Sequence, residues 1–510
     1  MAGMLNWLQG KKRKNLQNKP SLRRNGRRAR QLSTPLSVQG LEDRRMLAFT
    51  TGWEDNVLTI DITGGDDVQI STSGADLIVS GYQGKETFTG KAGTTLGFDI
   101  NGDGTLAQQT VRFNSALSGL TGGIDIDGID NLRVNAALDT GTGQFDVSAD
   151  GYFYSTGAIN AGALTFTLGN YAYAYAPVTA GSIEIEAKNL NFGATALLTA
   201  TDGNLSLTST GGGIVTQAGL VAQDTGSIIL DSAQGISVRD LSTAGGDLTA
   251  TGTSFSVSAT TAVDIAGTIN LDGVSGTVQI SKGIIAEEFT AQGIGSFNLN
   301  NASIFSVAGD VTVSTATGSI TTSADIATTG GDVTLTTPDY RPVNVQGITT
   351  AGGAITVESG TFTSGANDAL DAAGGVISIT TAGDLVIQGA VTAGSFEADA
   401  GGAFRGLQSF AIDAKALVDI SVGGNGMFLY GDLDSEGEIV LAGSSASQIS
   451  VRNLRAGEDI QISGRSFYGD TAYTIEAGGQ LNFNGISDFV QLRGMVNVAS
   501  LEAARSRRSR

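Results

Sequence analysis

The chain has 510 residues, of which 73 are glycine and only five are proline, and it contains no cysteine and no histidine. Twice the usual share of glycine, combined with many serine, threonine and branched aliphatic residues, is typical of short strands joined by tight turns, so we expect an all-β fold. The lack of cysteine excludes disulfides, and the lack of histidine removes the commonest general base and metal ligand.

Charge is distributed unevenly along the chain. Residues 1–48 carry twelve basic and two acidic side chains, and residues 505–510 carry four arginines, which leaves residues 49–504 with a net charge of −34. A body this acidic repels nucleic acid and anionic membranes, so we expect no nucleic-acid partner. No stretch approaches the roughly 20 consecutive apolar residues of a membrane-spanning helix, so we expect no transmembrane segment.

The first 48 residues are basic and polar, lack periodic apolar residues and cannot bury a core, so we expect a disordered segment. Near its end stand Leu41, Glu42, Arg44, Leu47 and Ala48. These residues resemble the LEPR-XLL motif found near the N-terminus of many large planctomycete extracellular proteins, with Asp43 in place of proline and Met46 in place of leucine. The resemblance implies export to the cell surface or medium. A solvated basic tail on an intracellular protein is the alternative.

Residues 49–121 contain three expected strands with glycine-rich turns, at Val57–Ile62, Val68–Ile70 and Leu77–Val79. The repeat that follows from residue 122 is not recognisable in this region. We therefore expect an N-terminal β region that caps the repeat and protects its end strand from edge pairing.

The sequence also contains a candidate calcium motif. Asp99, Asn101 and Asp103 match positions 1, 3 and 5 of an EF-hand loop, with glycine at position 6, but position 12 is Thr110 instead of an acid. Asp125 and Asp127 follow in GIDIDGID and would present their carboxylates on one strand face. These five oxygen-bearing residues, Asp99, Asn101, Asp103, Asp125 and Asp127, are the predicted calcium ligands. A polar turn and a solvated acidic face are the alternatives.

From residue 122 onward the sequence repeats. Gly309, Gly331, Gly353 and Gly375 stand 22 residues apart, and each is followed by two apolar residues spaced two apart, which face the same side of a strand. The same pattern, about 21 residues apart, begins at Gly122, Gly143, Gly162, Gly181, Gly203, Gly226, Gly246, Gly267, Glu287, Gly394, Ala416, Gly437, Glu458, Gly479 and Ala499.

A second strand often follows each start, as at Ile236–Val238, Val343–Val345, Leu385–Ile387, Ile449–Val451 and Val490–Leu492. About 21 residues accommodate three short strands with turns, which make one rung of a parallel β-helix. The sequence therefore predicts a parallel β-solenoid over residues 122–504, followed by a basic tail at 505–510.

Two outward features of the repeat bear on function. Asp310 and Asp332 occupy matching positions one rung apart, where stacked like charges cost energy unless a cation or solvent lies between them. Tyr171, Tyr173 and Tyr175 alternate with alanine. If they point outward, they form a platform for sugar stacking or protein contact; if they point inward, they fill a widened core.

The rung length and segments such as AGGDLTATG and TGGDVTLTT resemble filamentous-haemagglutinin-like and autotransporter passenger solenoids. That resemblance implies a right-handed solenoid with a structural or adhesive role at the cell surface, whose acidic, rod-like side would contact cell-surface or matrix glycans or proteins. The architecture also resembles pectate lyases and polygalacturonases. Their clefts need long loops, for which the near-constant rung length leaves little room. We therefore expect no enzyme activity, no catalytic residue and no cofactor apart from calcium, with a carbohydrate-active β-helix enzyme as the alternative.

Overall fold

The computed structural model describes residues 49–82, 84–104, 108–302, 305–366, 368–407 and 410–503. The expected export segment, its motif at residues 41–48 and the basic tail at 505–510 lie outside the described residues. All described residues belong to one compact unit. Within them every regular element is a strand, and no helix suited to crossing a membrane is found.

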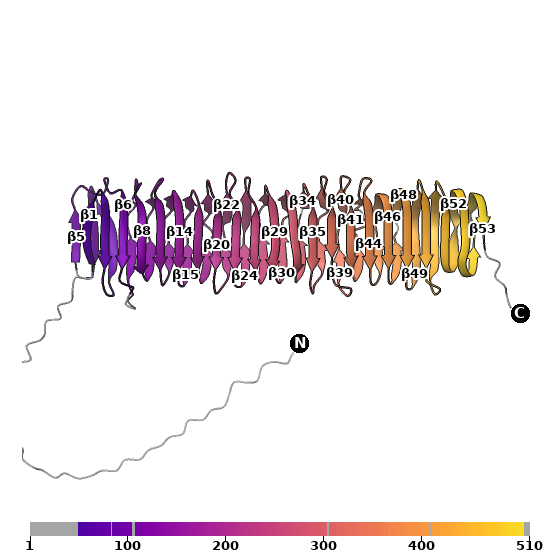
Figure 1. The fold of residues 1–510 in the computed structure, drawn as a ribbon, viewed down its shortest axis with the longest axis horizontal. Coiled ribbons are helices and arrows are strands. Elements are labelled where there is room, and N and C mark those ends of the chain that lie inside the picture. The colour runs from indigo at the N-terminus through magenta and orange to yellow at the C-terminus, as the bar shows by residue number, and fades with distance from the viewer. Residues whose placement is uncertain are drawn as a thin grey trace, which may run out of the picture. The chain divides into compact units, whose positions relative to one another are not determined.

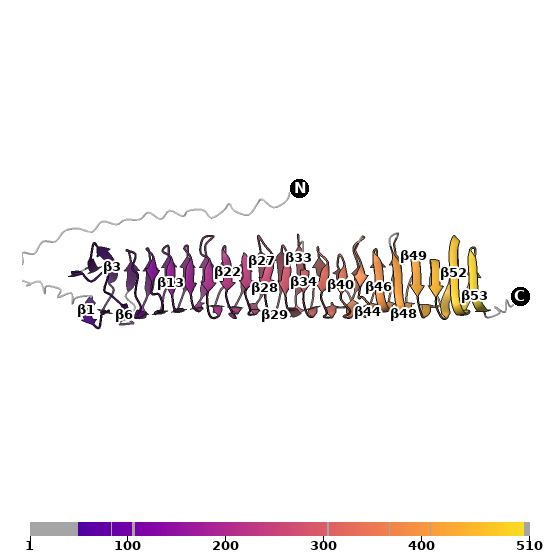
Figure 2. The ribbon, with the colours of Figure 1, turned by 90° about the horizontal axis from the view of Figure 1, so that it is seen from above.

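The strands stack along one axis, from β1 at the indigo end to β53 at the yellow end (Figures 1 and 2). Over most of the stack each strand pairs with the third strand before it and the third strand after it, in parallel. Each rung therefore contributes one strand to each of three parallel sheets. The fold is the predicted parallel β-solenoid.

The first sheet follows the predicted rung starts, including the one at Glu287, where no glycine stands. Its strands are β2 (Val57–Ile62), β6 (Gly97–Gly102), β8 (Gly123–Ile129), β11 (Gln144–Ala149), β14 (Ala163–Leu168), β17 (Ile183–Ala187), β20 (Leu205–Ser209), β23 (Ile228–Ser232), β26 (Leu248–Gly252), β29 (Thr268–Val274), β32 (Glu288–Ile294), β35 (Val311–Thr315), β38 (Val333–Thr336), β41 (Ile355–Ser359), β44 (Val376–Thr381) and β50 (Glu438–Gly443).

The second sheet contains or overlaps all the predicted second strands except the one at 490–492, which overlaps the end of β52. Its strands are β3 (Asp67–Ser73), β7 (Thr110–Phe113), β9 (Asn131–Val134), β12 (Phe153–Ser155), β15 (Tyr171–Ala174), β18 (Asn189–Phe192), β21 (Ile214–Thr216), β24 (Gly235–Val238), β27 (Ser254–Ser258), β30 (Thr277–Ser281), β33 (Ser296–Asn300), β36 (Ile320–Thr322), β39 (Pro342–Asn344), β42 (Thr361–Thr363), β45 (Leu385–Ile387) and β47 (Ala403–Gly406).

The third sheet consists of short strands. They are β10 (Leu138–Asp139), β13 (Ile159–Ala161), β16 (Val178–Ala180), β19 (Leu198–Ala200), β22 (Gly219–Ala222), β25 (Asp240–Thr243), β28 (Val263–Ile265), β31 (Ile284–Ala286), β34 (Phe305–Val307), β37 (Ile326–Thr328), β40 (Ile348–Thr350) and β43 (Leu370–Asp371). Towards the C-terminus six longer strands bend around corners and contribute to more than one sheet: β46 (Ala390–Ala400), β48 (Ala411–Val422), β49 (Gly426–Ser435), β51 (Gln448–Ala456), β52 (Ile460–Gln491) and β53 (Met495–Glu502).

The N-terminal region differs from the expectation that the rung phase is lost before residue 122. Strand β2 pairs in parallel with β6, and β6 pairs with β8, so the first sheet continues through this region. Longer insertions between these strands hide the phase in the sequence. Three antiparallel strands lie at the end of the stack: β1 (Phe49–Glu54) pairs with β2, β4 (Asp76–Gly81) pairs with β3, and β5 (Gly84–Phe88) pairs with β4.

The core is a column of inward apolar side chains that runs along the whole stack. Alternation along each strand points one set of residues inward, and these valines, isoleucines, leucines and phenylalanines are almost completely buried. Phenylalanine rings from neighbouring strands meet edge to face, as in Phe145 with Phe166 at 5.0 Å between ring centroids. Burial of this shared column, which no single rung could form, is what stabilises the stack.

Buried hydroxyls occupy the corners between sheets. In the repeated sequence Thr-x-Gly-Gly the Thr side chain donates a hydrogen bond to the carbonyl of the second glycine, at 2.6 Å for Thr243, 2.7 Å for Thr328 and 2.6 Å for Thr350. All three threonines are buried. The hydroxyl thus gives each of these turn carbonyls a side-chain donor inside the fold.

Candidate functional site

The tyrosines of the repeat point outward. Tyr171 and Tyr175 are 40% and 48% exposed, and Tyr173 between them is half-buried, whereas Ala172 and Ala174 face the core. Of the two orientations that the sequence leaves open, the structure therefore has the outward one.

The neighbouring side chains explain this orientation. Phe153 is the rung neighbour of Ala172, and its ring packs against Phe166 at 4.8 Å between centroids inside the core. Phe192, the rung neighbour of Ala174, is also buried. Small alanines fit beneath these large rings, and the alternation then requires the tyrosines to face solvent.

The preceding rung extends the aromatic surface. Tyr154 on β12 is the rung neighbour of Tyr173, and Tyr152 precedes it on the same face. We call the five residues the tyrosine face: Tyr152, Tyr154, Tyr171, Tyr173 and Tyr175. The rings touch in pairs, with centroids 5.7 Å apart for Tyr171 and Tyr173 and 5.6 Å apart for Tyr154 and Tyr175. The face thus consists of two ring pairs together with Tyr152, spread over two adjacent rungs.

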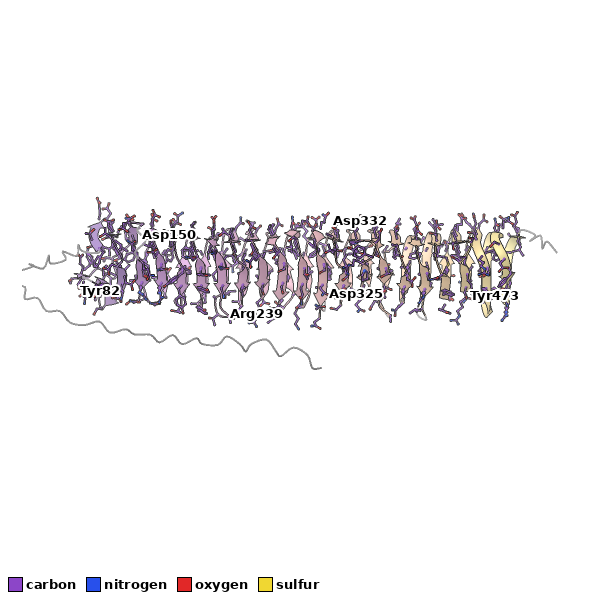
Figure 3. The ribbon with its side chains drawn as sticks, turned by 90° about the horizontal axis from the view of Figure 1, so that it is seen from below. Tyr82, Asp150, Arg239, Asp325, Asp332 and Tyr473 are labelled. Atoms are coloured by element: carbon purple, nitrogen blue, oxygen red, sulfur yellow. The ribbon has the colours of Figure 1, made fainter. Side chains whose placement is uncertain are left out.

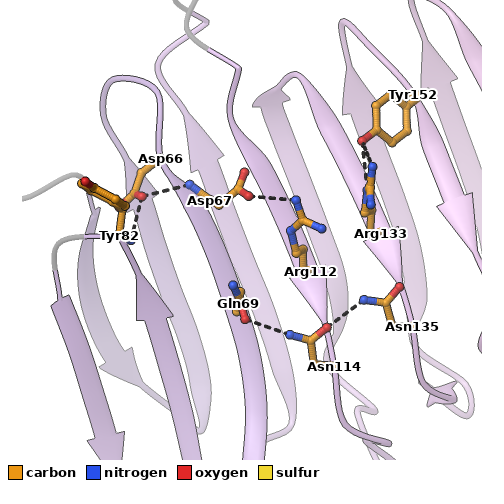
Figure 4. A network of polar contacts seen from close by, with 9 residues as sticks. All are labelled: Asp66, Asp67, Gln69, Tyr82, Arg112, Asn114, Arg133, Asn135 and Tyr152. Carbon is orange, nitrogen blue, oxygen red and sulfur yellow. Dashed lines mark hydrogen bonds and ion pairs between the residues drawn. The ribbon is translucent and has the colours of Figure 1, made fainter.

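Arg133 on β9 borders the tyrosine face. Its guanidinium donates hydrogen bonds to the Tyr152 hydroxyl from Nε at 2.9 Å and from Nη2 at 2.5 Å (Figure 4). It also lies over the rings of Tyr152 and Tyr154, at 5.3 Å and 5.8 Å from their centroids. Among the described residues Arg133 forms no ion pair, whereas Arg112 one rung earlier pairs with Asp67 at 2.8 Å. Arg133 therefore fixes the position of two tyrosines.

Amide side chains flank these residues along the solenoid axis. Asn189 and Asn191 on β18 are the rung neighbours of Tyr171 and Tyr173. On the other side, Asn135 donates a hydrogen bond to Asn114 at 2.7 Å, and Asn114 donates to Gln69 at 3.1 Å, which forms the row of amides in Figure 4. The aromatic surface thus lies between polar groups that can donate and accept hydrogen bonds.

Sequence reasoning identified Tyr171, Tyr173 and Tyr175 but missed Tyr152, Tyr154 and Arg133. The signal was available: GYFYS lies one rung before NYAYA, and alignment of the two segments at the rung spacing places their tyrosines side by side. The linear sequence indicated only the segment that begins with NYAYA, because tyrosine and alanine alternate over more residues there than tyrosine and phenylalanine do in GYFYS.

The residues of the calcium motif are distributed over strands and a turn. Asp99 and Asn101 lie on one face of β6, and the Asn101 amide donates to Asp99 at 3.1 Å and to Asp61 at 3.3 Å. Asp103, which follows β6, accepts hydrogen bonds from the Gly64 amide at 2.9 Å and from the Gln109 side chain at 2.6 Å.

The other expected ligands belong to the next rung. Asp125 and Asp127 lie on β8 as rung neighbours of Asp99 and Asn101. Thr110, at position 12 of the motif, is buried at the start of β7. In the described part of the chain no group of three or more acidic side chains has a geometry suited to a metal ion.

Asp125 is the centre of an acidic ladder on the first sheet. Its rung neighbours are Asp99 on one side and Asp146 on the other. Partial burial, followed by the charges of Asp99, Asp146 and Asp127, raises the pKa of Asp125. The ionised carboxylates of the ladder thus repel one another at neutral pH.

Asp310 and Asp332 have partners that the sequence did not indicate. A carboxylate oxygen of Asp310 accepts the backbone N–H of Asp332 at 2.8 Å, and one of Asp332 accepts the N–H of Ala354 at 2.7 Å. Each carboxylate therefore links its turn to the next rung through a charge-assisted hydrogen bond. Figure 3 places Asp332 at one edge of the solenoid, opposite Asp325.

A second polar cluster, also missed from the sequence, lies near the C-terminal end. We call Asp413, Asp434, Arg455 and Glu476 the arginine cluster; they are successive rung neighbours on the third sheet. Arg455 lies 3.5 Å from Asp434 and 3.0 Å from Glu476, and the cluster lines a shallow concavity of about 520 Å³. Partial burial raises the pKa of Asp434 although Arg455 opposes the shift. The spacing of about 21 residues between these positions was the available signal.

Comparison of the chain with protein-family models, curated proteins and solved structures gives no match. What the chain does must therefore be inferred from the solenoid and from the geometry of its surface.

Proposed function

We propose that this chain is an extracellular or cell-surface structural and adhesive protein, whose solenoid presents an acidic lateral surface to a partner. The observation that carries the proposal is the stacking of similar rungs with short turns, interrupted by few insertions after residue 122. A stack of this kind offers a long, stiff surface for contact instead of an enclosed reaction site. The N-terminal likeness to the LEPR-XLL motif adds the expectation of export.

The test is protease accessibility on intact cells of the organism that makes the protein, compared with lysed cells. Antibody detection of the solenoid after brief protease treatment should show digestion on intact cells, while a cytoplasmic marker stays whole. Protection of the solenoid until lysis would contradict surface display. It would favour the alternative that residues 1–48 are a solvated basic tail on an intracellular protein.

A carbohydrate-active enzyme is the second candidate, and the arginine cluster is what favours it. A carboxyl group whose pKa is raised, beside an arginine and a second carboxylate, is a combination that acid/base cleavage of polysaccharides uses. An activity at this site should release oligosaccharides from soluble polysaccharides and should be lost in Asp434→Asn. It should persist in Asp419→Asn, whose carboxyl also has a raised pKa but lies on the first sheet outside the cluster. No release by the native protein would exclude this candidate.

A further inference from the structure

The tyrosine face is a cluster of aromatic side chains on the described surface. It holds five of the ten tyrosines of the chain on two adjacent rungs. Tyr171 and Tyr175 are exposed, and four of the rings meet in two pairs, Tyr171 with Tyr173 and Tyr154 with Tyr175. Aromatic side chains are costly to leave in water without a partner, so a patch of this size marks a binding surface.

We propose that the tyrosine face binds a neutral, extended polysaccharide that lies along the solenoid axis. This inference deepens the proposed function, because it names a ligand class for the lateral surface. The apolar faces of sugar rings stack on the tyrosine rings, and the flanking asparagine amides bond the sugar hydroxyls.

The geometry favours a sugar chain over a protein partner. Successive rungs lie about 4.8 Å apart, which is close to the length of one sugar unit in an extended chain. The rung neighbours that border the face are Arg133, Asn189 and Asn191. Protein interfaces instead bury their aromatic anchors in well-packed, fully desolvated pockets near the centre of the contact. Rings bordered by amides suit a ligand with hydroxyl groups at its edges.

The charge of the molecule favours a neutral ligand. Residues 49–504 have a net charge of −34, and such a field repels polyanions. Arg133 is the cation at the face, and its Nε and Nη2 atoms are already bonded to the Tyr152 hydroxyl. It therefore positions aromatic rings, and one guanidinium offsets little of the surrounding negative charge that repels carboxylates and sulfates.

The experiment is affinity electrophoresis of the native full chain through gels containing soluble neutral polysaccharides (xylan, mixed-linkage β-glucan, hydroxyethyl cellulose) or acidic ones (polygalacturonate, alginate). We expect retardation in at least one neutral gel and none in the acidic gels. In the triple variant Tyr171→Ala, Tyr173→Ala, Tyr175→Ala the affinity should fall at least about tenfold, because each stacking ring contributes a fraction of the binding energy.

The matched control removes three exposed tyrosines elsewhere, by Tyr82→Ala, Tyr340→Ala and Tyr430→Ala, and should bind as the native chain does. If the first triple variant loses its circular dichroism spectrum, Tyr175→Ala alone replaces it, because this ring is exposed and follows the end of β15. Equal losses in both triple variants, binding only to acidic polysaccharides, or no binding to any neutral one would overturn the proposal. Protease accessibility tests surface display separately. A failure to bind polysaccharide would therefore leave the proposal of surface display standing, and the reverse also holds.

Discussion

A buried threonine hydroxyl at the corner of a rung stabilises the fold, whereas the hydroxyl of an exposed threonine on the same strand does not. Thr350 is completely buried and donates to the carbonyl of Gly353, whereas Thr349 on the same strand is exposed. A buried carbonyl that loses its donor cannot recover the bond from water. The corner threonines therefore fix the turns at which the chain passes from the third sheet to the first.

The substitution Thr350→Val keeps the shape of the side chain and removes only the hydroxyl. We expect it to lower the free energy of unfolding by about 1–3 kcal/mol, because the Gly353 carbonyl stays buried without its donor. Denaturant unfolding followed by circular dichroism measures the change. Thr349→Val is the control and should change stability by less than about 0.5 kcal/mol; a similar loss in both variants would contradict the role of the corner hydroxyl.

The acidic ladder gives a pH-dependent prediction. The pKa of Asp125 in the folded chain is raised above its ordinary value of 3.8, so the ionised carboxylate costs stability at neutral pH. That cost is relieved as the pH falls through the folded pKa towards 3.8. Asp125→Asn should therefore be more stable than the native chain at pH 7, and the difference should vanish as the pH approaches 3.8.

The gain should be small, under about 1 kcal/mol, because Asp125 is exposed and solvent screens the repulsion. Unfolding curves of both proteins between pH 3.5 and pH 7 measure it. Asp231→Asn is the matched control, since Asp231 is an exposed residue of the same sheet whose rung neighbours are threonines. The interpretation fails if Asp231→Asn shows the same pH-dependent gain.

At the scale of the strand and turn, glycine determines how closely two rungs approach. A Cβ atom on Gly331 would lie 2.2 Å from the carbonyl oxygen of Gly309 in the preceding rung, a distance that real contacts do not show. A Cβ atom on the adjacent Gly330 would meet nothing within 4 Å. The strict recurrence of glycine every 22 residues in this part of the chain follows from this stacking contact.

The pair of adjacent glycines offers a direct test. Gly331→Ala should destabilise the fold by about 1–3 kcal/mol, because the rungs must separate or the turn must shift. Gly330→Ala should be neutral or slightly stabilising, since it restricts only the unfolded chain. Thermal unfolding of the two variants side by side measures the contrast, and equal melting temperatures would show that the turns tolerate a side chain at this contact.

Sequence periodicity predicted the rungs because each rung repeats the same local pattern, a glycine at the turn followed by two inward apolar residues. The same periodicity failed before residue 122, where insertions between β2, β6 and β8 shift the phase although the strands still pair. The direction of Tyr171, Tyr173 and Tyr175 could not be predicted from their own alternation. It depends on how much room the phenylalanines of the neighbouring rungs leave, which is a property of the packed core.

The partners of the acidic residues were equally hidden. Asp310 and Asp332 looked like stacked charges in need of a cation, but the backbone of the next rung supplies a donor to each carboxylate. The arginine cluster joins residues from four rungs, and no short motif in the sequence links them. Pairing between rungs, and not linear spacing alone, therefore decides which polar side chains meet.

For the molecule as a whole, a stack of rungs predicts that stability is distributed along the axis and that one rung can be removed without loss of the fold. Residues 331–352 form one full rung, with β38, β39 and β40, and both Gly331 and Gly353 begin the same turn. Deletion of these residues joins Gly330 to Gly353 and restores the Thr-x-Gly-Gly corner. Strand β35 can then pair with β41, with its inward residues still facing the core.

We expect this deletion variant to fold and unfold cooperatively, with a solenoid shorter by about 4.8 Å. Far-ultraviolet circular dichroism and small-angle X-ray scattering measure these properties. Deletion of residues 331–341 is the control: it removes β38 alone, so β39, a strand of the second sheet, reaches the place of a first-sheet strand and the later rungs lose their register. If the half-rung deletion folded as well as the full-rung deletion, rung register would not be what specifies this fold.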